Sequence, residues 1–211
     1  MKTPWRRLAT LVVLAAPLSA APVLAQENPW AVRLGVTDLV PANKSAPIGA
    51  LGVPADKIDV SRKVIPELDV SYFFTSNLAA ELVLSYPQRH EVTVEGTSLG
   101  TFKELPPTLL AQWHFLPGQA FDPYLGAGVN WTWITPVNLS VPGVGTIDLS
   151  HSSWGYALQA GGDVNLDRNW FLNLDVKYVT IGADVKLFNG TKVSDVHVNP
   201  YLYSLGVGYR F

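Results

Sequence analysis

The chain of 211 residues has no cysteine, a formal net charge of −2 and a hydrophobic content of 48%. The lack of cysteine excludes disulfide bonds and thiolate metal sites. The slightly acidic balance gives no support to nucleic-acid binding, which needs clustered basic residues.

Residues 1–25 have the pattern of a secretory signal peptide. Lys2, Arg6 and Arg7 form a basic start, a short apolar run covers 8–16, and small residues at 23–25 form a cleavage site. The apolar run is shorter than the roughly 20 residues that a transmembrane helix needs. We therefore expect residues 1–25 to be removed on export and residues 26–211 to form a single domain.

Beyond the signal, about eight segments of roughly ten residues alternate apolar and polar side chains, which is typical of transmembrane β-strands. In chain order, the first four segments cover 30–40, 64–74, the region from 78 through 81, and 108–115. The second four cover 125–133, 154–164, 170–178 and 201–211. After 178 the apolar positions move by one residue, which suggests a bulge or a strand that leaves the lipid.

The connections between these segments alternate in length. Short turns are expected at 75–77, 116–120 and 167–169, and long loops at 41–62, 86–101, 134–150 and 187–193. This asymmetry predicts an all-β protein, an eight-stranded antiparallel transmembrane β-barrel of the outer-membrane type. We expect it in the outer membrane of a Gram-negative bacterium, against the lipids of that membrane, with both termini periplasmic and the long loops extracellular.

Several sequence motifs resemble the OmpW family of outer-membrane proteins, which includes the AlkL-type proteins that admit alkanes. The resemblance is carried by 105–115 (LPPTLLAQWHF), 123–130 (PYLGAGVN), 153–155, 167–170 and the terminal 208–211 (GYRF). It implies passive uptake of small hydrophobic solutes through a narrow apolar channel that releases them sideways into the membrane. The terminal aromatic Phe211 resembles the signal that the barrel-assembly machinery reads during biogenesis.

The resemblance also implies an apolar constriction formed by a leucine and a tryptophan in the lumen. By local match the leucine falls at Leu82, and Lys177 takes the place of the tryptophan. The alternation, however, turns Leu82 outward if Glu81 points inward. Lys177 can instead pair with Asp175 or with another carboxylate of the lumen.

The inward-facing positions of the expected barrel carry many charges. They include Arg33, Glu67, Asp69, Glu81, Asp163, Asp175 and Arg210. Because buried charges must be paired, we predict a plug of ion pairs and hydrogen bonds in the periplasmic half of the barrel. Such a plug argues against a wide aqueous porin, and an apolar solute that meets it needs another exit.

Three prolines suggest where that exit lies. Pro66, Pro106 and Pro107 fall toward the outer ends of the second and fourth segments, and each lacks the N–H of a ladder hydrogen bond. They predict a gap in the barrel wall, a lateral opening. The alternative is that these prolines only end strands or protect strand edges.

Two other function classes remain open. A structural or adhesive barrel would bind a partner through its long loops, especially 41–62. An outer-membrane enzyme would use Asp148, His151 and Ser153, although only the residue types match a hydrolase. The four histidines have no metal-ligand spacing. The sequence therefore predicts no catalytic residue, no metal and no cofactor.

Overall fold

The computed structural model of the chain describes residues 28–47, 54–141, 145–187 and 189–211. The expected signal peptide at 1–25 lies outside the described residues. Within the described ranges the chain forms fifteen β-strands. None of these residues belongs to a helix that is long and apolar enough to cross a membrane.

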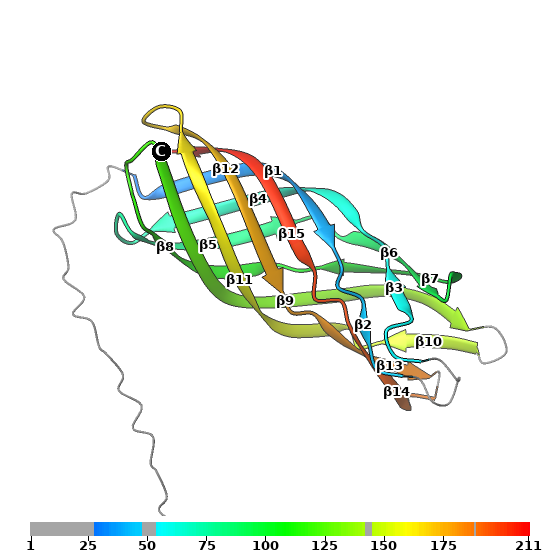
Figure 1. The fold of residues 1–211 in the computed structure, drawn as a ribbon. Helices are drawn as coiled ribbons and strands as arrows, with labels where there is room; N and C mark the ends of the chain where they lie inside the picture. Colours follow the sequence, from blue (N-terminus) through cyan, green and yellow to red (C-terminus); the bar gives the residue numbers. More distant parts are fainter. Residues whose placement is uncertain (1–27, 48–53, 142–144, 188) are drawn as a thin grey trace, which may run out of the picture.

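Eight strands close into an antiparallel barrel (Figure 1). They are β1 (Trp30–Val40), β4 (Lys63–Phe73), β5 (Leu78–Ser85), β8 (Thr108–His114), β9 (Phe121–Val141), β11 (Ser152–Asn165), β12 (Trp170–Val179) and β15 (Tyr201–Arg210). Each strand pairs with the next one in this order, and the ring closes where β1 pairs with β15, from Ala31 opposite Arg210 to Val40 opposite Tyr201. The predicted eight-stranded antiparallel barrel is confirmed.

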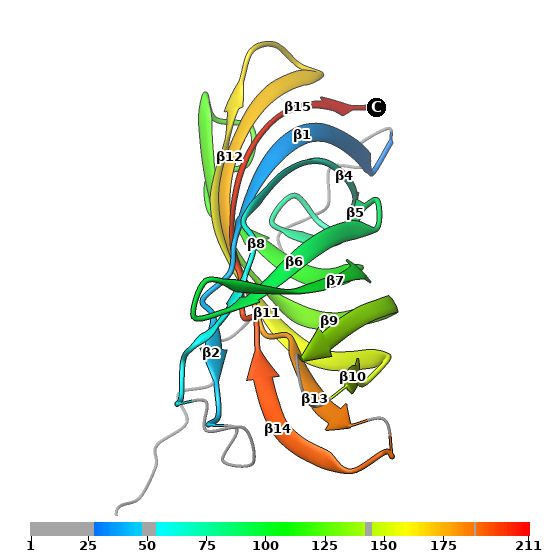
Figure 2. The same cartoon turned by 90° about the vertical axis from the view of Figure 1, so that its right-hand side faces the viewer.

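The barrel wall continues beyond one of its ends (Figure 2). The continuation is built from β2 (Lys44–Ser45), β3 (Ile58–Val60), β6 (Gln88–Val94), β7 (Thr97–Leu105), β10 (Gly145–Leu149), β13 (Gly182–Leu187), β14 (Lys192–His197) and the second half of β9. We call this the extended end, and we call the opposite end, where the short turns and the C-terminus lie, the short-turn end.

The strands of the extended end correct the sequence analysis, which expected loops over most of these residues. On these strands the polar residues point outward and the buried residues point inward, whereas a lipid-facing strand turns its apolar residues outward. On β6, for example, His90 and Val92 are buried inside while Arg89 and Glu91 are exposed. A strand with one buried face and one polar face is stable in water, so these segments extend the ladder beyond the lipid.

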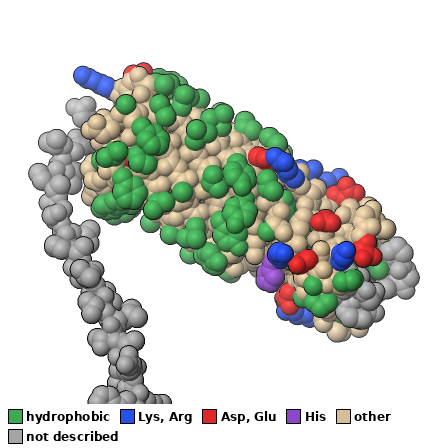
Figure 3. Space-filling model, viewed as in Figure 1, with side chains coloured by type: hydrophobic (Ala, Val, Ile, Leu, Met, Phe, Trp, Pro, Cys, Tyr) green, Lys and Arg blue, Asp and Glu red, His purple; other side chains and the backbone are tan. Residues whose placement is uncertain are grey.

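The outer surface of the barrel carries an apolar band. Leu34, Leu174 and Leu205 are 65%, 61% and 58% exposed, since their strands turn them away from the lumen. Figure 3 shows hydrophobic side chains over the barrel, whereas charged side chains gather over the extended end. Aromatic pairs such as Trp170 with Tyr209, whose ring centroids are 5.0 Å apart, lie on the same outer face. An apolar band with aromatic residues is the surface that lipid requires.

Candidate functional site

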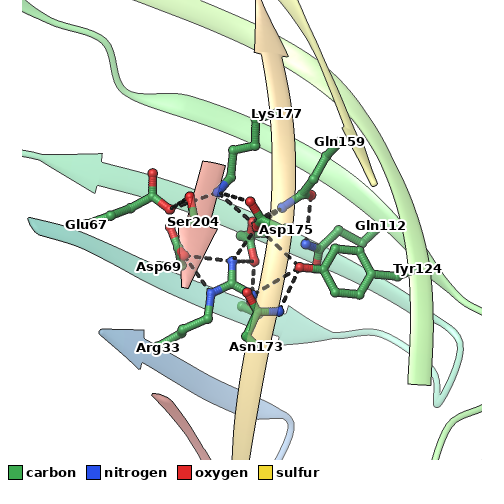
Figure 4. Close-up of polar contacts among 12 residues, drawn as sticks. Arg33, Glu67, Asp69, Gln112, Tyr124, Gln159, Asn173, Asp175, Lys177 and Ser204 are labelled. Atoms are coloured by element: carbon green, nitrogen blue, oxygen red, sulfur yellow. Dashed lines mark hydrogen bonds and ion pairs between the residues drawn. The ribbon is translucent and has the colours of Figure 1, made fainter. Parts of the chain in front are cut away.

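A network of charged side chains fills the lumen of the barrel on the side of the short turns, and Figure 4 shows its central contacts. We call it the polar plug, and its members are Arg33, Glu67, Asp69, Glu81, Gln112, Tyr124, Gln159, Asp163, Asn173, Asp175, Lys177, Ser204 and Arg210. All eight barrel strands contribute to it, because each of them places alternate residues in the lumen. These side chains are buried, apart from Arg210, which is half-buried.

Arg33 lies at the centre of the polar plug. Its Nε donates to Asp69 Oδ2 at 2.7 Å, and its Nη2 donates to Glu81 Oε2 at 2.9 Å and to Asp175 Oδ2 at 3.3 Å. Nη1 donates to the Tyr124 hydroxyl at 3.3 Å. A guanidinium has five N–H donors in one plane, so a single arginine can join carboxylates from three strands.

Lys177 caps the plug on the side of the extended end. Its Nζ donates to Glu67 Oε1 at 2.8 Å and to Asp175 Oδ1 at 3.0 Å. The ammonium is 1% exposed, and such a burial is tolerated only where the charge is paired. Lys177, which the resemblance places at the constriction, is therefore part of an ion pair. Pairing with a lumen carboxylate was the alternative that the sequence left open.

Arg210 and Asp163 form the part of the plug nearest the short turns. Arg210 Nη2 donates to Asp163 Oδ2 at 2.6 Å, and the guanidinium stacks 4.1 Å above the Phe171 ring. Asn173 Nδ2 donates to Asp163 Oδ1 at 2.7 Å and to the Tyr124 hydroxyl at 2.9 Å. The structure thus brings together all seven residues of the predicted plug.

The plug is tightly packed at Gly161. Gly161 lies opposite Asp175 on the neighbouring strand, and a Cβ added to it would lie 2.6 Å from the Tyr124 hydroxyl oxygen. This distance is well inside van der Waals contact, so only glycine lets the tyrosine reach the network. A solute cannot pass this level without displacing paired charges.

Leu82 does not lie in the lumen. It is 38% exposed on the outer face of β5, while its neighbours Glu81 and Val83 are buried inside. The period of two along a strand sends Leu82 and Glu81 to opposite faces, and Glu81 is fixed in the lumen by Arg33. The expected constriction at Leu82 is therefore wrong, and Leu82 belongs to the lipid-facing band.

The interior of the extended end is apolar. A cavity with about 790 Å³ of empty space, including its opening to solvent, lies there. We call it the apolar cavity, and its walls are Ile58, Val60, Val92, Val94, Leu99, Phe102, Glu104, Ile134, Leu139, Val141, Ile147, Leu149, Ile181, Ala183, Val185, Val196 and Val198. Within the described ranges, Glu104 is the one wall residue with a polar side chain.

A second, smaller space lies between the apolar cavity and the polar plug. It has about 410 Å³ of empty space, including its opening to solvent. It shares Ile181 with the apolar cavity and Lys177 and Glu67 with the plug. We call it the junction cavity. Its wall also includes Ser85 and Pro106, so it borders the part of the barrel where the ladder is interrupted.

That interruption affects both sides of the segment 85–87. On one side the β4–β5 ladder stops at Glu67 opposite Ser85, and pairing resumes where the Ser61 N–H donates to the Glu91 carbonyl. On the other side the β5–β8 ladder stops at Val83 opposite Thr108 and resumes at Gln88 opposite Glu104. We call this segment and its flanks, with Pro66, Pro87, Pro106 and Pro107, the wall break.

The prolines explain why the ladder fails at this point. Pro66 is exposed on the outer face of β4, next to the last pair with β5. Pro106 and Pro107 separate β7 from β8, and Pro87 separates β5 from β6. None of these four residues can donate a backbone hydrogen bond. Pro87 contributes to the same gap but was missed by the sequence analysis, because it falls in a segment that was expected to be a loop.

Asn130 holds one edge of the wall break in place. Its Nδ2 donates to the carbonyls of Pro106 and Pro107, both at 3.3 Å, and to Thr108 Oγ1 at 2.9 Å. The side chain is fully buried. A single amide therefore ties Pro106 and Pro107 to β9, on the side that faces away from β5.

The residues considered for hydrolysis do not form a triad. His151 Nε2 lies 3.7 Å from Asp148 Oδ1, and both side chains are exposed. The buried Ser153 hydroxyl instead accepts the N–H of Gly182. Among the residues that the structure describes, no group of three or more His, Asp or Glu side chains could hold a metal ion.

Comparison with known proteins agrees with this architecture. The sequence profile of the OmpW family matches residues 26–211. The chain belongs to the OmpW family. It is 36% identical over 216 residues to outer membrane protein W of Vibrio cholerae, covering 95% of this chain and 97% of that protein.

Solved structures place this OmpW family member among outer-membrane barrels. The crystal structure of OprG from Pseudomonas aeruginosa is similar with a TM-score of 0.74 and 31% identity, covering 87% of this chain and 96% of that one. The NMR structure of AlkL in lipid bilayers has a TM-score of 0.69 and 21% identity, covering 100% and 97%, and it shares the fold. The protein is thus an outer-membrane barrel of the OmpW family.

Proposed function

We propose that this OmpW family protein is a passive facilitator, which admits small hydrophobic molecules at its extended end and releases them sideways into the outer membrane. The observation that carries the proposal is the position of the apolar interior. The apolar cavity and the junction cavity meet at Ile181, which lines both, and the junction cavity ends on the ion pair between Lys177 and Glu67. A hydrophobic solute therefore has a favourable path as far as the plug and an unfavourable one beyond it.

Passage straight through the lumen is disfavoured by the energetics of the plug. Removing one partner of a buried ion pair costs about 3–5 kcal/mol, and a solute would have to separate several such pairs around Arg33. An apolar molecule offers no hydrogen bonds in return. The plug thus supports an exit on its extended-end side, which a solute reaches before it meets the ion pairs.

The wall break is the exit that we propose. It borders the junction cavity at Ser85 and Pro106, and it lacks ladder bonds on both sides of 85–87. Opening it would break few backbone hydrogen bonds, because few are formed. The prolines at 66, 106 and 107 therefore serve as a lateral opening in this proposal.

The proposed route requires a defined orientation. The extended end, with its charged outer surface, would face the outside, and both termini would face the periplasm after removal of residues 1–25. The barrel-assembly machinery would insert the chain. A single cysteine placed at Lys192 on β14 should react with a membrane-impermeant maleimide in intact cells. Labelling only after cell lysis would indicate the opposite orientation.

A cross-link across the wall break tests the exit. The chain has no cysteine, so a pair at Ser85 and Pro106 can be introduced without background. A matched control pair at Ala80 and Ala111 lies opposite on the same two strands, away from the break. Uptake of an apolar fluorophore into outer-membrane vesicles should fall severalfold when the first pair is oxidised, return on reduction, and stay constant for the control.

Two results would count against the proposal. Equal flux before and after oxidation of the Ser85–Pro106 pair would exclude the wall break as the exit. Equal and negligible uptake of the fluorophore and of a polar solute such as glucose would exclude a transport function. The second result would favour a structural or adhesive barrel that binds a partner with its extended end.

A further inference from the structure

A buried acid and a buried histidine lie together at the wall of the apolar cavity. Glu104 on β7 and His90 on β6 are 1% and 0% exposed, and His90 Nε2 lies 3.3 Å from Glu104 Oε1. The imidazole also stacks on Phe102, with ring centroids 5.6 Å apart. Neither of the two side chains belongs to the polar plug.

The hydrogen bonds of this pair are incomplete. Both carboxyl oxygens of Glu104 are buried and have no hydrogen-bond partner in the structure, and the same holds for His90 Nε2. A buried polar group without a partner costs several kcal/mol, so such a group is retained only where something compensates for it. The rest of the described cavity wall is hydrocarbon, and it cannot supply that partner.

The contact of His90 with the backbone fixes where a proton must lie. Nδ1 lies 2.8 Å from the Ser61 carbonyl, which can only accept, so Nδ1 carries a hydrogen. Two arrangements then avoid a clash of lone pairs between Nε2 and Oε1. Either Nε2 also carries a hydrogen and faces a carboxylate, or Glu104 is protonated and donates to Nε2. The pair is electrically neutral overall in both arrangements.

The second oxygen of Glu104 is an acceptor in both arrangements. In either arrangement the proton is directed to the contact between Nε2 and Oε1, so Oε2 keeps its lone pairs free. Oε2 is buried just beneath the apolar surface of the cavity, so a bound molecule reaches it after a small movement of the Glu104 side chain. A neutral O–H or N–H group would bond to it. A carboxylate or another anion would instead place lone pairs against lone pairs and would lose its hydration without a donor.

From this geometry we propose that the apolar cavity selects small amphiphiles with an apolar body and one neutral hydrogen-bond donor, such as phenols and alcohols. The donor binds Glu104 Oε2, and the body packs against the aliphatic wall. The inference rests on the proposed function, since it names the class of solute that the same route would carry. Glu104 is also two residues from Pro106, so a bound molecule lies next to the wall break.

Three compounds of similar shape test this selection. 2-Naphthol has a donor, 2-methoxynaphthalene has an oxygen but no donor, and naphthalene has neither. Binding is measured with the protein in lipid nanodiscs, and empty nanodiscs give the background of lipid partition. A hydrogen bond to a buried carboxyl group should make 2-naphthol bind about tenfold more tightly than 2-methoxynaphthalene.

Substitutions at Glu104 separate the acceptor from the shape of the cavity. Glu104→Leu should abolish the preference and leave naphthalene binding within about twofold. Glu104→Gln should keep most of it, because an amide can donate to His90 and still present its oxygen. Glu91→Gln, on the exposed face of β6, is the matched control and should behave as the unaltered protein. Heat-modifiable migration on gels checks that each variant is a folded barrel.

A second readout follows the histidine directly. The ¹⁵N shift of His90 Nε2 should change when 2-naphthol binds and stay constant with naphthalene. A preference that persists in Glu104→Leu, or naphthalene binding without any preference, would overturn this inference and leave the transport proposal intact. If none of the three compounds binds, the inference falls, and the vesicle uptake experiment then decides whether the transport proposal falls with it.

Discussion

The interior of the barrel differs between its two ends although the same sheet encloses both. In the middle of β12 the inward residues are Asn173, Asp175 and Lys177, whereas β13, which follows it, turns Val185 into the apolar cavity. The outer face changes the other way, from exposed leucine and valine on β12 to exposed aspartate and lysine on β13 and β14. The period of two continues across the boundary, and only the assignment of polar and apolar residues to the two faces is exchanged.

This exchange teaches what each half can do. Ion pairs depend on direction and distance, so the polar plug has a single arrangement that a passing molecule would disrupt. Contacts between aliphatic side chains are non-directional, so in the proposed route the apolar cavity would accept solutes of different shapes. A selective feature in that cavity must therefore be polar, and Glu104 is the described wall residue that provides one.

The largest effect is expected when the plug loses its central cation. Arg33→Met leaves Asp69, Glu81 and Asp175 buried around an apolar side chain. The free energy of unfolding should fall by about 3–5 kcal/mol, as for other broken buried ion pairs. Urea unfolding in lipid vesicles measures it. Arg62→Met, which removes an exposed ion pair with Asp38, should leave unfolding unchanged. An equal loss in both variants would mean that burial does not distinguish the two pairs.

A polar group in the apolar half should affect both transport and stability. Ile181 lines both cavities and is 1% exposed. Ile181→Asn introduces an amide without a designed partner, which should cost about 1–3 kcal/mol and reduce fluorophore uptake severalfold. Ile181→Val keeps the surface apolar and serves as the control. Undiminished uptake in Ile181→Asn would show that solutes do not pass Ile181.

A smaller effect is expected from one added methyl group in the plug. Gly161→Ala places a Cβ against Tyr124 and should lower the free energy of unfolding by about 1 kcal/mol or somewhat more. In a Tyr124→Ala background the same change should cost less, since only the contact with Asp175 Cβ, also at 2.6 Å, then remains. A double-mutant cycle measures this coupling. If the losses of the two single variants simply add, contact with Tyr124 is not the source of the strain.

The smallest effect belongs to the short turns, outside both halves of the lumen. The N–H groups of Trp170 and Asn169 donate to Asp167 Oδ1 and hold the pKa of this carboxyl below its ordinary value of 3.8. The bonds therefore stabilise the fold above that pH, and the contribution is lost as the pH falls through the lowered pKa. Asp167→Asn should differ slightly from the unaltered protein at pH 6 and converge with it near pH 2. A constant difference across this range would show that ionisation of Asp167 is not involved.

The eight barrel strands could be predicted because lipid-facing strands carry a simple signal. An outward stripe of large apolar residues, such as Leu34 and Val36 on β1, stands out against inward polar residues. The polar plug followed from the same alternation, because each inward charge had to find a partner. Lys177 was placed in the lumen for this reason, and its partners Glu67 and Asp175 were among the inward carboxylates that the alternation identified.

The extended end could not be predicted in the same way. Its strands have an ordinary polar outer face, so Gln88–Val94 and Thr97–Leu105 read as loop composition. The walls of the apolar cavity come from segments far apart in the sequence, and they meet only through the closure of the sheet. One local signal was present: the phase change after 178 marks the point where apolar residues turn inward at Val179 and Ile181. His90 and Glu104 gave no signal, because they lie 14 positions apart on the two strands of a hairpin.

The length of β9 has a mechanical consequence. Its 21 residues reach about 70 Å along the strand, whereas about 10 residues are enough to cross a bilayer. The same strand pairs with β8 up to Asn130 and with β7 from Trp133 onward, so it runs unbroken behind Pro106 and Pro107. It holds β7 and β8 in one line on that side of the gap. In the proposed lateral release the opening would therefore form on the side of β5, as a narrow slit with one rigid edge, while the ring as a whole stays closed.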